Sequence, residues 1–376
     1  MITPVRRMFS RIAQHITQYI TQYMALPTAM ILGLALTLPA SAEEIAVLLP
    51  QKGRLTQVGL SLRDGLLAAY YQDSLTHTNT PRLRFYDSSD SPAPELVALA
   101  ANQGASIVIG PLDRDQVQAL LNDGSPPVTV IALNRGEGSQ PNLIQMALAP
   151  EDEISTLVQW MKSRGIQAPH MLAQADDTTA PRFLARFEEA WQPADGRKLP
   201  SHYLDSRQKG GIAASIKALK DSTKGADSFF LASPGITSQV QPALTYYGMK
   251  TALFSLSSAW DPSADTASLN DLDGLGFCGL PWLLSDTGPE QQALYEAQPR
   301  PLANHDRLYA LGADAWTVAR SLTLLRHGDA LDLRTGQLRL TNQGHLTRLP
   351  TCAEIRHGMA TVLLSPPPPD NADHRR

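Results

Sequence analysis

Short apolar segments alternate with amphipathic segments through the first part of the chain. The apolar run at residues 45–49 is followed by Val58, Leu62 and Leu66, whose four-residue spacing predicts a helix with one buried face. Apolar runs then recur, and we expect strands at residues 45–49, 83–86, 105–109, 128–133 and 143–147. Continuous apolar strands that alternate with amphipathic helices are typical of a parallel sheet covered on both faces.

The same alternation restarts after residue 147. The segment Pro150-Glu-Asp-Glu153 is a favourable helix start, because proline fits the first turn and acidic side chains favour the positive end of the helix dipole. Further strands are expected at residues 171–174, 228–232 and 252–256, and a long helix at residues 306–326. The pattern predicts an α/β fold of two doubly wound, Rossmann-like lobes, with a cleft between the carboxyl ends of the two sheets.

A chain with this architecture crosses between its lobes more than once. We expect the first lobe to contain residues 43–147 and 280–328, and the second lobe to contain residues 148–279 and 329–365, joined by crossover hinges. The prolines and polar residues of the tail, 366–376, predict disorder.

The first 42 residues predict a secretory signal. Residues 1–24 are basic and polar, residues 25–38 are mostly apolar, and Ala40-Ser-Ala42 is a small-x-small site, so we expect cleavage near Ala42. The apolar stretch is short for a bilayer span, which makes a retained anchor the weaker alternative. We therefore expect an exported, periplasmic protein without stable membrane insertion.

Composition and charge reduce the classes of partner that we expect for this chain. The chain has 32 Lys and Arg against 36 Asp and Glu, a net charge of −4, which argues against nucleic acid or an anionic membrane surface as the main partner. The two cysteines, Cys278 and Cys352, are too few for a four-thiolate zinc site. In an oxidising compartment they are a candidate disulfide, with two buried thiols as the alternative.

Motifs for catalysis are scarce. The chain has no phosphate-binding glycine loop, no nucleophile elbow and no paired histidine spacing, so we expect no cofactor, no metal and no catalytic residue. Ser206 and Lys209 match the S-x-x-K motif of penicillin-recognising enzymes, but the companion motifs of that class are missing. We interpret this match as accidental and expect a protein that is not an enzyme.

The loops that follow the expected strands should line the cleft. The loop after the third strand has Pro111, which lacks an N–H, and Asp113, whose carboxylate would repel the carboxylate of an amino-acid ligand. This weakens an amino-acid receptor without excluding another small molecule. The candidate cleft residues are Gln51, Ser88, Ser89, Pro111, Leu112, Asn134, Asp176, Asp177, Ser233 and Trp260.

Several motifs resemble a known family. They include Gly104-Ala-Ser-Ile-Val-Ile-Gly-Pro-Leu112, Ala147-Leu-Ala-Pro-Glu-Asp-Glu153 and Tyr309-Ala-Leu-Gly-Ala-Asp-Ala-Trp316. In this order they resemble the C-terminal domain of the penicillin-binding protein activator family, LpoA. The resemblance implies a type I periplasmic-binding-protein fold and stimulation of a class A penicillin-binding protein by direct contact. Against that family, we expect a chain without the lipid-anchoring cysteine, since none precedes Cys278, and without the N-terminal helical-repeat domain.

Two functional hypotheses follow. The first is a non-catalytic periplasmic regulator of peptidoglycan synthesis that contacts a penicillin-binding protein, as the resemblance implies. The alternative is a periplasmic solute receptor of a transporter or sensor, with an amino acid, a peptide or a muropeptide as its ligand. A regulator of this kind needs a complementary surface and no catalytic residues.

Overall fold

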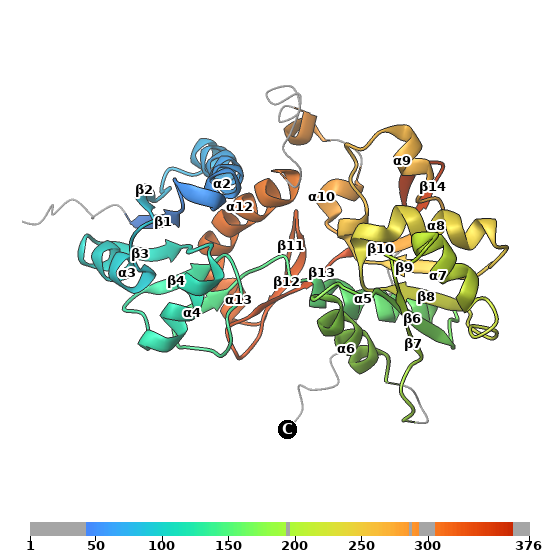
Figure 1. The fold of residues 1–376 in the computed structure, drawn as a ribbon. Helices are drawn as coiled ribbons and strands as arrows, with labels where there is room; N and C mark the ends of the chain where they lie inside the picture. The colour runs from blue at the N-terminus through green and yellow to red at the C-terminus, as the bar shows by residue number, and fades with distance from the viewer. Residues whose placement is uncertain (1–42, 193–195, 286–287, 293–304, 364–376) are drawn as a thin grey trace, which may run out of the picture. The chain divides into compact units, whose positions relative to one another are not determined.

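The computed structural model describes residues 43–192, 196–285, 288–292 and 305–363. The expected signal at residues 1–42 and the expected tail at 366–376 lie outside these residues. The two large sheets of the unit that begins at Glu44 have mainly parallel strands and carry helices on both faces (Figure 1). This confirms the predicted α/β fold with doubly wound lobes.

The first lobe is built on a five-stranded parallel sheet with the order β2-β1-β3-β4-β5. Its strands are β1 Glu44–Leu49, β2 Arg82–Asp87, β3 Ala105–Ile109, β4 Thr129–Ala132 and β5 Leu143–Gln145. One apolar core joins the sheet to α2 (Thr56–Thr76) and α12 (His305–Arg320), and a second joins it to α3 (Ala93–Asn102) and α4 (Arg114–Asp123). The short helix α13 (Leu322–Arg326) follows α12.

The second lobe is built on a seven-stranded sheet with the order β15-β14-β10-β9-β8-β6-β7. Five strands are parallel: β6 Pro169–Gln174, β7 Ser201–Leu204, β8 Ser228–Leu231, β9 Ala252–Ser255 and β10 Leu275–Gly279. The last two, β14 Thr351–Arg356 and β15 Met359–Val362, are antiparallel. Helices α5 (Pro150–Ser163) and α6 (Ala180–Trp191) cover one face, and α7 (Gly211–Leu219) and α8 (Thr237–Tyr246) cover the other.

A small third sheet lies between α13 and β14 in the sequence. It is antiparallel and has the order β11-β12-β13. Its strands are β11 Leu331–Leu333, β12 Gly336–Leu340 and β13 Leu346–Leu349. Leu338 and Leu346 belong to the core of the first lobe, whereas Leu284 of α10 (Pro281–Leu284) belongs to a core of the second. The packing of these segments therefore differs from the expected division at residues 279 and 328. Leu284 packs in a core of the second lobe, and Leu338 and Leu346 pack in the core of the first.

The long helix expected at residues 306–326 is divided into α12 and α13. Ser321 separates them, and its backbone N–H donates to the carbonyl of Val318, three residues earlier, as in a tightened turn. After this turn, Leu322 and Leu325 lie in the core of the first lobe.

Two glycines allow α2 and α12 to pack at very close range. A Cβ atom at Gly65 would lie 2.7 Å from the carbonyl carbon of Tyr309, and one at Gly312 would lie 2.8 Å from the carbonyl carbon of Leu62. Each helix thus presents a glycine to the backbone of the other. This contact holds α12 against the sheet although about 160 residues of chain, including most of the second lobe, separate it from β5, the preceding strand of the first lobe.

The two cysteines are directly opposite each other on neighbouring strands. Cys278 of β10 and Cys352 of β14 are register partners in the antiparallel ladder, and the structure joins them in a disulfide. Both residues are buried in a core of the second lobe. The bond closes a loop with a sequence separation of 74 and attaches the returning C-terminal strands to the parallel sheet.

Reduction of this disulfide should destabilise the protein. A loop of this length corresponds to about 4 kcal/mol of unfolding free energy in the chain-entropy description. Urea denaturation of the oxidised and the reduced protein measures the difference. The double variant Cys278→Ala/Cys352→Ala is the control, because a reductant should not shift its midpoint. Equal midpoints for oxidised and reduced wild-type protein would contradict the prediction.

Candidate functional site

The polar groups of the loops after β1 and β2 form hydrogen bonds with each other. The backbone N–H of Gln51 donates to Asp87 Oδ1 at 3.1 Å and to Ser89 Oγ at 3.0 Å, and the N–H of Lys52 donates to Ser89 Oγ at 2.9 Å. Hydrogen bonds, chiefly from the Ser89 hydroxyl, lower the pKa of Asp87 against the effect of desolvation. Ser88 is buried, and its N–H donates to the carbonyl of Leu49. The N–H groups of Gln51, Lys52 and Ser88 therefore already have an acceptor within the chain.

The loops after β3 and β4 are joined in a similar way. Leu133 N–H donates to the carbonyl of Pro111 at 2.9 Å, and Asn134 Nδ2 donates to the carbonyl of Leu112 at 3.1 Å. The Leu112 side chain is buried in the core of the first lobe. Asp113 caps α4 by accepting a hydrogen bond from the N–H of Asp115. This local role accounts for the carboxylate that the sequence places beside Pro111.

The second-lobe candidates also form local turns and caps. Asp177 Oδ1 accepts from the N–H of Thr179 at 2.8 Å, from its hydroxyl at 2.7 Å and from the N–H of Ala180 at 3.3 Å. Desolvation raises the pKa of Asp177, but these bonds and one from Ser233 outweigh it and lower the pKa below its ordinary value. Ser233 Oγ accepts from the N–H of Gln174, while Asp176 accepts from the Gln174 side chain and pairs with Arg207.

The predicted cleft residues therefore form three separate groups. They are Gln51 with Ser88 and Ser89, then Pro111 and Leu112 with Asn134, and then Asp176 and Asp177 with Ser233. Among the hydrogen bonds of the described residues, none joins one group to another. Trp260 is apart from all three, because its ring packs on Phe277 in a core of the second lobe with a centroid distance of 5.4 Å.

A buried charged network links the two lobes, and the sequence did not reveal it. Ser257, in the turn η3 (Ser257–Ala259) after β9, donates from its N–H and its hydroxyl to the two carboxylate oxygens of Glu153, at 3.0 and 2.9 Å. Arg307 of α12 donates to the Ser257 hydroxyl and to the Ser257 carbonyl, both at 2.8 Å. Arg348 of β13 donates to Glu153 at 3.4 Å. Glu153, Ser257 and Arg348 are all buried.

The electrostatics of this network follow from its burial. Desolvation lowers the pKa of the Arg307 guanidinium, and the attraction of Glu153 opposes that shift. The Glu153 carboxylate is surrounded by donors from β13 and η3, so its charge is compensated. Because α12 covers the first lobe and η3 follows a second-lobe strand, Arg307 joins the lobes at the carboxyl end of β9.

A second ion pair crosses between the lobes nearby. Arg135, in the loop after β4, contacts Asp152 of α5 at 3.0 Å and donates to the carbonyl of Leu346 at 2.7 Å. Burial raises the pKa of Asp152 above its ordinary value, although Arg135 and Arg348 favour the charged form. The segment Pro150-Glu-Asp-Glu153, which the sequence marks as a helix start, thus also supplies the two carboxylates that connect the lobes.

Within the described part of the chain, no group of three His, Cys, Asp or Glu side chains is placed to hold a metal ion. Ser206 and Lys209 lie on the exposed segment before α7, and no hydrogen bond between their side chains is seen there. Over the same described residues, no helix has the length and apolar character needed to cross a membrane.

The comparisons with known proteins agree with this architecture. The model of the family described as "LppC putative lipoprotein" matches residues 10–358. The chain belongs to the LppC family. Its similarity to the penicillin-binding protein activator LpoA confirms the resemblance inferred from the sequence motifs.

Two curated relatives illustrate the similarity. LpoA of Photobacterium profundum is 26% identical over 340 residues, which cover 81% of this chain and 54% of that protein. LpoA of Escherichia coli is 26% identical over 319 residues, 73% of this chain and 45% of that protein. The chain spans about half the length of the curated relatives it matches.

Solved structures show the same fold. The LpoA C-domain of Haemophilus influenzae, described as a regulator of PBP1A, matches with a TM-score of 0.73 at 23% identity, over 86% of this chain and 100% of that one. A "putative branched-chain amino acid ABC transporter" of Chromobacterium violaceum matches with a TM-score of 0.68 at 26% identity, over 83% and 99%. A type I periplasmic-binding-protein fold is common to both, so the fold alone does not decide the function.

Proposed function

We propose that this protein is a non-catalytic periplasmic regulator that stimulates a class A penicillin-binding protein by direct contact. The observation that carries the proposal is the similarity to penicillin-binding protein activators across 81% of the chain. The proposal extends the activity named for those relatives to a chain that spans about half their length.

The polar groups at the strand ends support a protein partner over a small anionic solute. The N–H groups of Gln51, Lys52 and Ser257 already donate to Asp87, Ser89 or Glu153. A solute that displaced these side chains would have to replace their hydrogen bonds before gaining any affinity. Contact through the outer surface has no such cost.

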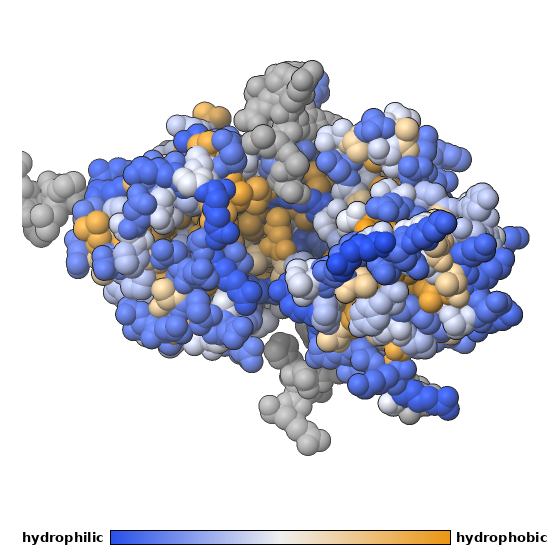
Figure 2. Space-filling view, in the orientation of Figure 1, coloured by the Kyte–Doolittle hydropathy of each residue, from blue (hydrophilic) through white to orange (hydrophobic). Residues whose placement is uncertain are grey.

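The surface offers apolar area for such contact. Figure 2 shows a face that is mostly hydrophilic, with apolar side chains reaching the surface over α12. Leu308 of α12 is half-buried and packs against the core of the first lobe. An apolar area bordered by polar residues is a feature of protein contact sites.

Activation without catalysis has a simple thermodynamic basis. A regulator that binds the active conformation of its partner more tightly than the inactive one shifts the partner toward activity. A coupling of this kind is typically worth about 1–3 kcal/mol, or roughly 5-fold to 150-fold in affinity. A stable surface is sufficient, and no nucleophile or general base is needed.

The test is glycan-strand synthesis by the cognate class A penicillin-binding protein. We expect the purified protein to bind the synthase and to raise the polymerisation rate in a saturable manner, by a factor of roughly 5 to 150. A solute receptor of the same fold, added at equal concentration, is the control. Absence of binding together with an unchanged rate would reject the proposal.

A solute receptor is the second candidate, favoured by the match to the Chromobacterium violaceum protein. It requires that a ligand stabilise the folded protein. A ligand at 100 times its Kd adds about 2.7 kcal/mol, which a thermal unfolding scan detects readily. Stabilisation by an amino acid, together with no effect on the synthase, would favour the receptor.

Export is the remaining part of the proposal. The basic, apolar and small-residue segments within residues 1–42 support a cleaved secretory signal. Cell fractionation with N-terminal sequencing of the mature protein tests it. We expect a periplasmic protein that begins near Glu43.

A further inference from the structure

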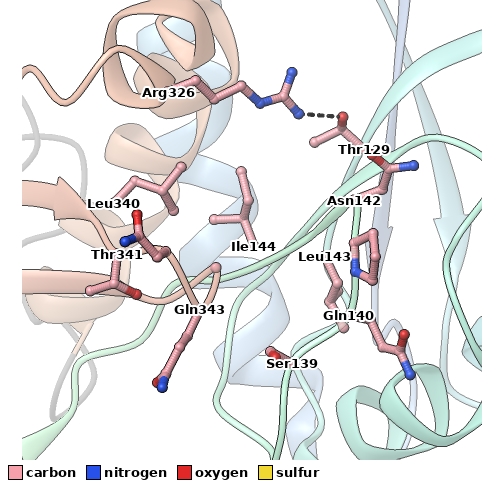
Figure 3. A pocket seen from close by; sticks show the side chains of 13 residues that line it. Thr129, Ser139, Gln140, Asn142, Leu143, Ile144, Arg326, Leu340, Thr341 and Gln343 are labelled. Atoms are coloured by element: carbon pink, nitrogen blue, oxygen red, sulfur yellow. Dashed lines mark hydrogen bonds between the residues drawn. The ribbon is translucent and has the colours of Figure 1, made fainter.

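We propose that the groove between β5 and the β12–β13 turn is a binding site for a short peptide with a free C-terminal carboxylate. The groove has a volume of about 520 Å³ and is shown in Figure 3. That volume lies within the range of roughly 300–1,000 Å³ typical of small-ligand sites. The groove is distinct from the strand-end loops and from the charged network between the lobes, and the proposal does not depend on contact with a synthase.

The groove has a cationic end. Arg326, at the end of α13, donates from Nη2 to Thr129 Oγ1 at 2.9 Å. Among the ion pairs of the described residues, none contains Arg326, and no acidic side chain lines the groove. A guanidinium has five N–H donors and binds a carboxylate in a bidentate manner, so most of its capacity is available to a ligand. The negative end of the α13 dipole also favours a cation at this position, and that interaction leaves the N–H donors of Arg326 unused.

The rest of the groove suits the uncharged part of a peptide rather than a second charged group on the ligand. Figure 3 shows Ile144 and Leu340 between the end with Arg326 and Thr129 and the end with Ser139 and Gln343. Such an apolar floor suits aliphatic side chains. Four carboxamide residues line the groove, Gln140, Asn142, Asn342 and Gln343. The carboxamides of Gln140 and Asn142 point away from it in Figure 3 and donate to carbonyls of the first lobe, so Asn342 and Gln343 have the donor and acceptor groups that a peptide group needs.

The walls are fixed before any ligand binds. Gln140 Nε2 donates to the carbonyl of Leu121, and Asn142 Nδ2 donates to the carbonyl of Pro126. On the other side, Thr341 exchanges hydrogen bonds with Gly344 and His345 and closes the turn. Gln145 N–H donates to the carbonyl of Gly344 at 2.8 Å, which attaches the turn to β5. A preformed site avoids the entropy cost of ordering its walls.

Gly344 has a specific part in this attachment. Its φ of +75° is one that other residues adopt rarely, and a Cβ atom there would lie 2.7 Å from the carbonyl oxygen of Leu143. Glycine therefore allows the turn to approach β5 closely enough to complete the groove.

Titration of the full chain with trialanine tests the site, with backbone amide NMR as the readout. We expect binding with a Kd of about 1 mM or tighter. The amide shifts should concentrate at residues 139–144 and 341–344. Trialanine with an amidated C-terminus should bind at least about tenfold more weakly, because it lacks the carboxylate for Arg326.

Variants of two arginines test which cation binds the carboxylate of the peptide. Arg326→Gln should weaken trialanine binding by about tenfold or more. Arg339→Gln is the matched control, since Arg339 is an exposed arginine of β12 that donates to the carbonyl of Gly328 and does not line the groove. Failure of trialanine to bind, shifts located elsewhere, equal binding of the amidated peptide or equal effects of the two variants would each overturn the proposal.

Discussion

Replacing Gly312 with alanine is expected to lower the free energy of unfolding by about 3 kcal/mol. Helix propensity alone predicts the opposite sign, because alanine is favoured over glycine within a helix by about 1 kcal/mol. The new methyl group would collide with the Leu62 backbone of α2, and backbone cannot rotate away as a side chain can. The helices would have to separate, at the expense of the core that they share. Urea denaturation followed by circular dichroism measures the change.

A matched substitution tests whether the close approach is the cause. Gly235 lies in the turn η2 (Pro234–Ile236), and a Cβ atom there would have no neighbour within 4 Å. Gly235→Ala should therefore change stability by no more than about 0.5 kcal/mol. Gly65→Ala should be as damaging as Gly312→Ala, since it places a Cβ atom against the Tyr309 backbone. A stabilised Gly312→Ala variant would show that the helices can move apart at little cost.

The sequence was most informative where strands are continuously apolar. The run at residues 105–109 coincides with β3, and the runs at 45–49 and 252–256 differ from β1 and β9 by one residue at one end. Such segments are buried on both faces of the sheet, so an apolar residue is expected at every position of the strand. The strands β7, β11 and β13 were not anticipated. They are short, and residues such as His202 and Asp332 interrupt their apolar pattern.

The candidate site was predicted less completely than the fold. Loop residues such as Asp177 and Ser233 do occur together after neighbouring strands, because parallel strands end at one edge of a sheet. Their use as caps and turn formers depends on hydrogen bonds that residue spacing leaves open. The network around Glu153 was missed for a different reason. Ser257 and Arg348 are 104 and 195 residues away from it in the sequence, and no local pattern pairs them.

The second large effect is expected at Glu153. Glu153→Ala should lower the free energy of unfolding by about 3–5 kcal/mol, the usual cost of breaking a buried ion pair by removing one partner. The Arg348 guanidinium, with its side chain 1% exposed, would lose its carboxylate, and Ser257 would lose both of its acceptors. Denaturant titration of the variant and of the wild-type protein provides the measurement.

Glu151→Ala is a close control because it changes the same first turn of α5. Both carboxylates interact with the positive end of the helix dipole, so that contribution is similar in the two variants. Glu151 pairs with Arg182 at 2.8 Å, but their side chains are 30% and 57% exposed. An exposed pair of this kind contributes about 0–1 kcal/mol. Equal losses in the two variants would contradict a special role for the Glu153 network.

The double variant Glu153→Ala/Arg348→Met separates uncompensated charge from lost packing. If the cost of Glu153→Ala arises mainly from the unpaired guanidinium, removing that cation as well should restore part of the stability, because a buried pair can often be replaced by apolar side chains at little net cost. If the cost arises from lost packing, the second substitution should add to the first. We expect partial restoration. A double variant less stable than Glu153→Ala alone would show that Arg348 stabilises the protein through its other contacts, the carbonyls of Thr335 and Ala149.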